Sequence, residues 1–340
     1  MNIDEFNRSL PDLKKHRTIK ECFHHKKQEC KGKIKQAHSI QKNGKLSILE
    51  SEVNKNKSLY TFTNFISSEK SVISELLPIG KGEASTFYGF CDYHDSFLFS
   101  EIENKKFEFD NPKHLFLHSY RSFAHSYHKK REEYKLYDNI ENSKLKNTVS
   151  QFRKQIMQFG NKIAMKELNR SKEYLDQSIE NENWESLEYV VYEKEGLFPI
   201  AVSSQLCPLV SYRNIPINNH LEFHIPFENL MLTFLPDIDS TVVIIAAFPN
   251  QSKAVKLIEE LDSLNDLKLE YAITSLIIAN CENTFFSPLF WNSLTKKEKR
   301  KLLDEFIANE NLQFRNKFFK SSFNFFDEKY EISNLKKSCS

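Results

Sequence analysis

The spacing of apolar residues changes along the chain and predicts two kinds of structure beyond the first hundred residues. Between residues 112 and 183, apolar side chains recur every three or four positions, and the segment has one Gly and no Pro after Pro112. This spacing predicts two or three long helices with a break near 138–144. From residue 184 short apolar runs alternate with Pro and Asn, which favours strands at 187–194, 198–204, 221–227, 230–236 and 241–249.

Further elements are predicted on either side of these regions. Helices are expected at about 251–263, 265–280 and 294–308. Near the N-terminus, SLYTFTNFIS (58–67) predicts a strand pair, followed by a polar loop that ends at Gly80 and Gly82. Residues 84–103 favour a turn or strand that runs into a helix, with Phe97, Leu98 and Ile102 on one shared face.

The predicted fold class is therefore α+β, with a small N-terminal module, a helical middle and a C-terminal mixed α/β domain. The expected divisions are a leader (1–20), the module (21–110), a helical region (111–183), the α/β domain (184–330) and a tail (331–340).

Composition supports a folded chain with a local excess of positive charge. Of 340 residues, 40% are hydrophobic and 29 are Phe, so there is enough apolar surface for a large core. Lys plus Arg (48) nearly balances Asp plus Glu (46), but lysines are concentrated in the first sixty residues. Such a region attracts polyanions such as DNA or RNA. The alternative is a solvated lysine-rich surface.

The sequence predicts a cytoplasmic protein that does not enter a membrane. No apolar stretch approaches the roughly 20 residues of a membrane span, and the longest run, 242–248, suits a buried strand. The first residues, MNIDEFNRSL, lack the pattern of a secretory signal. Clustered cysteines in such a protein favour metal binding over disulfides. With seven Gly in the chain, a glycine-rich nucleotide loop is not expected.

Three cysteines and a histidine predict a structural zinc site. Cys22 and Cys30 flank a loop, and Cys91 and His94 form a tight C-x-x-H pair at an expected helix start. Three thiolates and an imidazole suit tetrahedral Zn²⁺, and a small module gains from the metal the stability that a small core cannot give. The long spacing of the first pair leaves open that His24 or His25 replaces one cysteine. Cys207, Cys281 and Cys339 are interpreted as ordinary core or tail thiols.

Two short motifs between and around these ligands resemble the HNH, or His-Me finger, nucleases, which are built on a treble clef. KIKQAHSI (33–40) matches the strand that carries the family's histidine, and FCDYHD (90–95) matches the second ligand pair and the start of the helix. The resemblance implies that His38 is the general base and that Asp92 or Asp95 binds a catalytic Mg²⁺ or Mn²⁺. The wider string also resembles bacterial proteins associated with phage defence.

The resemblance covers residues 20–103 and is incomplete. Ala37 stands where the family usually has an Asp or His metal ligand, and 52 residues separate His38 from Cys91, more than is usual. A structural role for His38 beside the zinc site is the competing interpretation. In the nuclease interpretation, Lys33, Lys35 and Arg121 contact phosphate.

Two features outside the module complete the functional hypotheses. A row at helical spacing, His114, His118, Arg121, His125 and His128, is interpreted mainly as the polar face of a helix. Glu282 and Asn283 are interpreted as residues that cap or anchor a loop. The predicted function is a metal-dependent endonuclease that acts on DNA or RNA, with a C-terminal domain that recognises a protein partner or regulates activity. The alternative is a zinc-stabilised module that binds nucleic acid or protein without catalysis.

Overall fold

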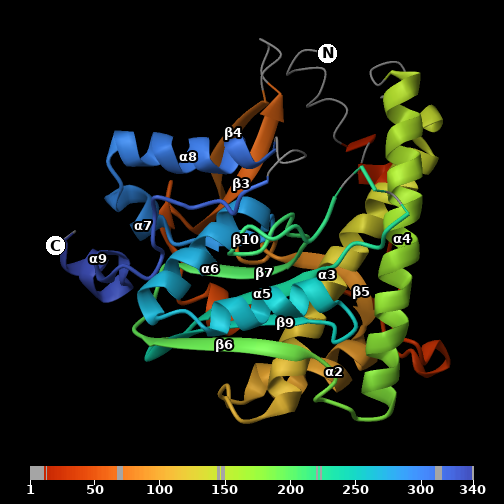
Figure 1. The fold of residues 1–340 in the computed structure, drawn as a ribbon, viewed down its shortest axis with the longest axis horizontal. Coiled ribbons are helices and arrows are strands. Elements are labelled where there is room, and N and C mark those ends of the chain that lie inside the picture. The colour runs from red at the N-terminus through yellow and green to blue at the C-terminus, as the bar shows by residue number, and fades with distance from the viewer. Residues whose placement is uncertain are drawn as a thin grey trace.

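The protein is an α+β structure in which a large sheet lies between two layers of helices (Figure 1). It is a computed structural model that describes residues 11–12, 14–66, 72–143, 146, 150–219, 221–222, 224–310 and 316–338. The large sheet has the strand order β2-β3-β10-β7-β8-β9-β6, with β4 paired to β3, and every pairing in it is antiparallel in the described residues. Its strands are β2 (Ser51–Val53), β3 (Asn56–Ile66), β4 (Val72–Ile79), β6 (Glu188–Glu195), β7 (Ile200–Leu206), β8 (Leu230–Pro236), β9 (Ser240–Ala247) and β10 (Thr284–Phe286).

A second, two-stranded sheet precedes the first long helices. It pairs β1 (Ile34–His38) with β5 (Thr86–Cys91), and α2 (Asp92–Asn104) follows β5 directly. The remaining helices are α3 (Pro112–Asp138), α4 (Gln151–Glu180), α5 (Ser252–Asp262), α6 (Asp266–Asn280), α7 (Pro288–Ser293), α8 (Lys296–Glu310) and α9 (Ile332–Ser338). Residues 22–40 and 84–104 are called here the β1–β5–α2 module.

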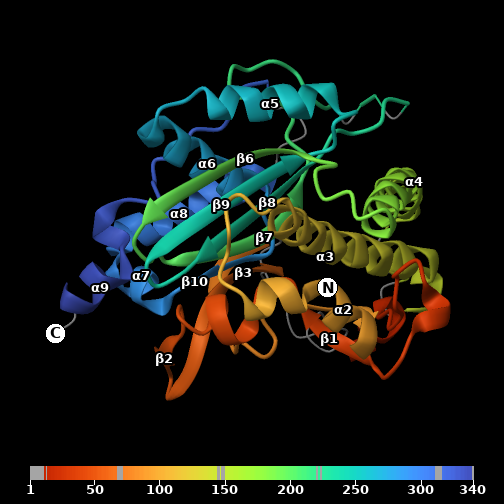
Figure 2. The same cartoon turned by 90° about the horizontal axis from the view of Figure 1, so that it is seen from below.

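The central strands of the large sheet, β7, β8 and β9, are buried on both faces, and the side chains of β8 show how. On β8, Leu230, Leu232 and Phe234 join the core formed with α5 and α6, while Met231 joins the core formed with α3. Successive side chains of a strand point to opposite faces, so a strand covered on both sides is apolar throughout. Figure 2 shows α5 on one side of the sheet and α3, with α2 and β1 beyond it, on the other.

Most elements of the second half were predicted correctly. The helical region contains α3 and α4 with a break at Ile140–Asn142, and α5, α6 and α8 lie close to the predicted helices. The predicted strand at 221–227 is wrong, because its described residues form turns and loop. The described residues of SLYTFTNFIS, 58–66, belong to one long strand, β3, rather than a pair, and the polar loop predicted before Gly80 contains β4. The predicted tail is also more ordered than expected, since α9 buries Ile332 and Leu335 in the main core.

The expected boundary at residue 110 does not separate two independent sheets. β3 lies in the predicted N-terminal module but pairs with β10, placing Thr61 opposite Phe285. The buried Leu59 belongs to the same core as the C-terminal strands. The long stretch between His38 and Cys91 is therefore an insertion into the β1–β5 hairpin that supplies strands to the large sheet.

Helix α3 runs through the centre of the molecule, which overturns the interpretation of its histidine row. It packs against the β7, β8 and β9 strands, and also against β5, α2 and α4. His114, His118, Arg121, His125 and His128 are all buried rather than forming a solvated face. Where α3 crosses the sheet, Ser122 hydrogen-bonds to Ser203 (2.9 Å) and Thr233 (2.8 Å), and these small side chains allow the close approach.

Candidate metal centre and histidine site

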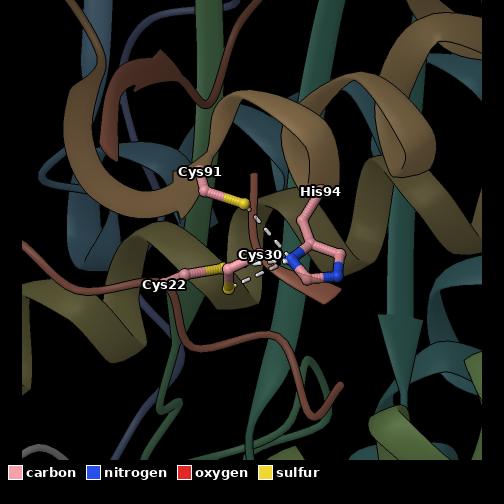
Figure 3. Close-up of side chains that lie close together, drawn as sticks. All are labelled: Cys22, Cys30, Cys91 and His94. Carbon is pink, nitrogen blue, oxygen red and sulfur yellow. Dashed lines mark hydrogen bonds between the residues drawn. The ribbon is translucent and has the colours of Figure 1, made fainter. Parts of the chain in front are cut away.

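The side chains of the four predicted zinc ligands converge on one point (Figure 3). The Sγ atoms of Cys22, Cys30 and Cys91 lie 3.4, 3.6 and 3.3 Å from Nδ1 of His94. All four donor atoms lie within 4.8 Å of one another. This Cys₃His group is the only group of three or more such donors among the described residues.

The spacing of these donors fits a tetrahedral zinc ion. With Zn–S near 2.3 Å and Zn–N near 2.0–2.1 Å, a regular tetrahedron separates sulfur from nitrogen by about 3.5 Å. The three observed S···N distances, 3.3 to 3.6 Å, bracket that value. Three sulfur donors and one imidazole are also the chemistry of a closed structural zinc site. The residues therefore fit Zn²⁺ in number, type and geometry.

Backbone geometry around Gly32 brings the two ligand pairs together. Gly32 has φ +77°, and a Cβ at this position would lie 2.5 Å from Oδ2 of Asp92. That carboxylate instead accepts a hydrogen bond from the Lys33 N–H (2.9 Å), while the Asp92 N–H donates to the Lys33 carbonyl (2.9 Å). The loop after Cys30 is thus tied to the first turn of α2, which carries Cys91 and His94. Sequence reasoning did not identify Gly32.

The thiols differ in how readily they ionise. Burial raises the pKa of Cys22. Burial also opposes ionisation of Cys91, but hydrogen bonds from the backbone of His94 and Lys31 outweigh it and lower the pKa of that thiol. Cys91 stands at the N-cap of α2, where free N–H groups favour a thiolate. A divalent cation would compensate the mutual repulsion of three thiolates in this cluster.

His24 and His25 do not take the place of a cysteine in this group. The His24 ring stacks on His94 at 3.9 Å between centroids, with 8° between the planes, and its Nδ1 accepts a hydrogen bond from the Lys26 N–H (3.1 Å). Burial lowers the pKa of His24 to about 3. The ring of His25 stacks on the other side of His24. Both imidazoles therefore pack beside the metal centre and add apolar contact to it.

His38 lies at the end of β1 with a fixed tautomer. Its Nδ1 is 3.0 Å from the carbonyl oxygen of Ala84. A carbonyl can only accept, so Nδ1 carries the proton and Nε2 is the basic nitrogen of the neutral ring. Burial lowers the pKa of His38, and the positive charges of Lys42 and Arg121 lower it further against the opposing effects of the Ala84 carbonyl and Glu103. The imidazole is therefore neutral and able to accept a proton at neutral pH.

The two predicted carboxylates have different surroundings. Both oxygens of Asp92 have partners, the Lys33 N–H and the Lys35 ammonium at 3.7 Å. Asp95 is buried, and its Oδ1 has no hydrogen-bond partner while Oδ2 lies 3.6 Å from Lys35. Burial raises the pKa of Asp95. Lys35 thus bridges the two carboxylates, whereas Lys33 is exposed.

Arg121 and Glu103 complete the polar group around His38. Arg121 is 2% exposed, forms an ion pair with Glu103, and places its guanidinium 4.4 Å from the centre of the Phe99 ring. Asp95, Phe99 and Glu103 follow at four-residue steps, so they share one face of α2. Sequence reasoning missed Glu103 as a partner, although this spacing from Asp95 could have identified it.

A C-terminal residue fixes the chain directly after His38. Asn283, which precedes β10, donates hydrogen bonds to Oγ of Ser39 (2.8 Å) and to the carbonyl of Ser203 (2.7 Å). The sequence interpretation of Asn283 as an anchor agrees with this position. The histidine is thereby linked to the large sheet as well as to its own hairpin.

Comparisons with known proteins do not assign a family to this arrangement. No protein-family model, no curated protein and no solved structure matches the chain. In the described part of the chain, no helix has the length and apolar character needed to cross a membrane.

Proposed function

We propose that the protein is a metal-dependent endonuclease of the HNH type, in which a zinc-stabilised treble clef holds His38 as the general base. The observation that carries the proposal is the succession of β1, β5 and α2, with a neutral imidazole of fixed tautomer at the end of β1. A treble clef has the same order of ligand loop, hairpin and ligand-bearing helix. Zinc at Cys22, Cys30, Cys91 and His94 would hold the loop against the helix.

His38 would take a proton from the attacking water. The Ala84 carbonyl orients the ring so that Nε2 accepts the proton. Because burial and two nearby cations lower the pKa of His38, the base is already neutral at neutral pH. Cleavage should therefore depend little on pH above about 7 and fall as pH drops below the unperturbed histidine range.

Asp95 fits the catalytic cation better than Asp92 does. Its Oδ1 is buried without a partner, whereas both oxygens of Asp92 are engaged. When bound, Mg²⁺ or Mn²⁺ would stabilise negative charge on the phosphate and the leaving oxygen. Lys33 is exposed and Lys35 lies near Asp92 and Asp95, and both would position the nucleic acid backbone. Arg121 is buried against Glu103, so we assign it to positioning that carboxylate rather than to an exposed phosphate contact.

One observation favours a second candidate, a module that binds nucleic acid without cutting it. Asp95 is already near Lys35, and Glu103 is already paired with Arg121. The charge of the site is thus largely balanced without an added cation. Any role of the C-terminal region in recognising a protein partner stays a prediction.

A cleavage assay tests the nuclease directly. Purified protein is incubated with supercoiled plasmid and with single-stranded DNA and RNA, each with Mg²⁺ or Mn²⁺. We expect cleavage that His38→Ala lowers by at least about a hundredfold, in the range of losing a general base. The matched control is His224→Ala, which removes an exposed histidine from the loop before β8. Zinc content and thermal unfolding of both variants check that the fold persists. Intact substrates under all conditions, with binding retained, would favour the binding module.

A further inference from the structure

Two aromatic side chains on α2 face solvent beside the metal centre. Tyr93 is 37% exposed and Phe97 is 62% exposed, and their rings stack with 6.0 Å between centroids and 21° between planes. The sequence interpretation placed Phe97 on one shared face with Leu98 and Ile102, which is wrong for Phe97 because its ring is exposed. Leu98 and Ile102 are buried, so α2 does not need the phenylalanine for its core.

A surface hollow lies next to these rings, with one lysine in its lining and further lysines beside it. Its lining consists of Lys31, Gly32, Asp92, Tyr93, Ser96, Phe97 and Ser100. The ammonium of Lys31 lies 5.3 Å from the centre of the Tyr93 ring, and Lys33 is exposed nearby on the same loop. The one carboxylate in the hollow, Asp92, is held by the Lys33 N–H and by Lys35. The hollow therefore combines two exposed aromatic rings with Lys31 within it and Lys33 beside it.

We propose that this hollow binds single-stranded nucleic acid, with bases stacked on Tyr93 and Phe97 and phosphates near Lys31 and Lys33. Aromatic faces beside a basic groove bind unpaired bases without sequence preference, whereas the faces of paired bases are hidden within the duplex. An acidic protein segment would use the lysines but not the stacking geometry, so the aromatic pair favours nucleic acid. The inference deepens the proposed function, on which it rests for a reaction, by naming a single strand as the substrate class.

The hollow continues along α2 toward the face that carries Asp95 and Glu103. Successive helix residues are separated by about 100°, so Asp92 and Ser96 lie on α2 between the aromatic pair and the face that carries Asp95 and Glu103. The Lys35 ammonium contacts both parts of the helix surface, since its Nζ lies 3.7 Å from Oδ1 of Asp92 and 3.6 Å from Oδ2 of Asp95. A strand stacked on Phe97 and Tyr93 would thus pass Asp92 before it reaches Asp95.

Fluorescence anisotropy without added Mg²⁺ or Mn²⁺ tests binding apart from cleavage. The probes are a labelled 20-nucleotide oligothymidylate, a 20-nucleotide oligouridylate and a 20-base-pair DNA duplex. We expect the single strands to bind more tightly than the duplex. The double variant Tyr93→Leu/Phe97→Leu should weaken single-strand binding by at least about tenfold, because leucine keeps apolar volume but cannot stack. Phe152→Leu is the matched control, since Phe152 is 73% exposed on α4.

The results separate this inference from the nuclease. Binding lost in the double variant but kept in the control supports it, with zinc content of both variants verifying the intact metal centre. Unchanged single-strand affinity in the double variant, or tighter binding of the duplex, would overturn it even if the protein cuts nucleic acid. Conversely, aromatic-dependent binding with no cleavage would leave the inference standing while the nuclease proposal fails. Capture of an acidic peptide with no affinity for any probe would also overturn it.

Discussion

The large sheet and the β1–β5–α2 module are stabilised in different ways. β8 and β9 are almost wholly buried between α3 on one face and α5 with α6 on the other. The module packs on α3 through Phe87 and Phe90 of its two-stranded sheet and through Phe99 of α2. The rest of the module is the ligand loop and the Cys₃His group, in which Cys22 and Cys91 belong to the same core and Cys30 is exposed. The comparison indicates that hydrophobic burial fixes the hairpin, and we expect metal binding at the Cys₃His group to fix the ligand loop.

Removing one zinc ligand should give the largest difference between the two regions. Cys30 is the most exposed of the four ligands, so Cys30→Ser perturbs packing least. We expect loss of bound zinc and local unfolding around residues 22–33, because structural zinc sites supply on the order of 10 kcal/mol in small modules. Metal analysis and hydrogen exchange measure the two effects. Protection of β8 and β9 should persist.

The matched control for this experiment is Cys207→Ala, a thiol outside the Cys₃His group. It should keep one zinc per chain and normal exchange in the ligand loop. Full zinc content in Cys30→Ser, or equal loss of protection throughout the large sheet, would contradict the assignment of the metal to the loop alone.

A cavity in the large sheet should lower the stability of the fold and leave zinc binding unchanged, the reverse of the effect expected for Cys30→Ser. Phe286 on β10 is fully buried and contacts the rings of Phe62, Phe290 and Phe325. Phe286→Ala should lower the free energy of unfolding by about 3–5 kcal/mol, since a large buried ring leaves a cavity. Urea denaturation measures this loss, and zinc content at zero urea should be unchanged. Phe97→Ala, which removes an exposed ring, should change stability by less than about 0.5 kcal/mol.

The sequence predicted the large elements well where one physical signal dominated. The spacing in α3 and α4 and the apolar run of β9 each reflect a repeating pattern of burial. The Cys₃His group was predictable because zinc requires those residue types and reduced cysteines seldom cluster otherwise.

The features that could not be predicted from the sequence depend on contacts between residues far apart in the chain. The pairing of β3 with β10 joins residues more than two hundred positions apart, and no local pattern encodes it. The histidines of α3 have polar spacing but are buried, because the helix is covered by the sheet, the module and α4 together. The positions of Glu103 and Asn283 beside His38 and Ser39 depend on the same packing.

Substitution of Asn283 tests the hydrogen-bonded link between the β1–β5–α2 module and the large sheet. Asn283→Ala removes the hydrogen bonds to Ser39 and to the Ser203 carbonyl and leaves buried polar groups without partners. We expect a loss of about 1–3 kcal/mol in the free energy of unfolding. Hydrogen exchange should show the change at residues 38–40 as well as in β7. Asn280→Ala, which removes an amide hydrogen bond to the Leu276 carbonyl within α6, should have a smaller effect. Equal effects of the two variants would argue against a specific link.

The smallest expected effect is a pH dependence of stability that originates where α3 contacts both regions. Burial lowers the pKa of His118 and His125 well below the usual value, and nearby Arg121 and Lys129 lower the pKa of His118 and His125, respectively, further. The unfolded chain therefore binds protons that the folded chain does not, as pH falls below the unfolded pKa near 6.5. Stability should be fully present above that pH and decrease below it, with a slope of at most about 1.4 kcal/mol per pH unit for each histidine.

Urea denaturation between pH 7.5 and 5 measures this slope, and variants assign it. His118→Leu should decrease the slope by the contribution of one histidine, because leucine cannot take up the proton. This decrease is expected even if the substitution also changes the absolute stability. His224→Leu, at an exposed position, should leave the slope as in the wild-type protein.

His118 lies on the sheet side of α3 near Phe107, whereas His125 packs edge-on against Phe87 of the module. A decrease in slope for His118→Leu and for His125→Leu alike would place proton-linked stability at both contacts of the helix. An unchanged slope in both variants would show that neither imidazole is kept neutral by burial, and that α3 is less enclosed than its packing indicates.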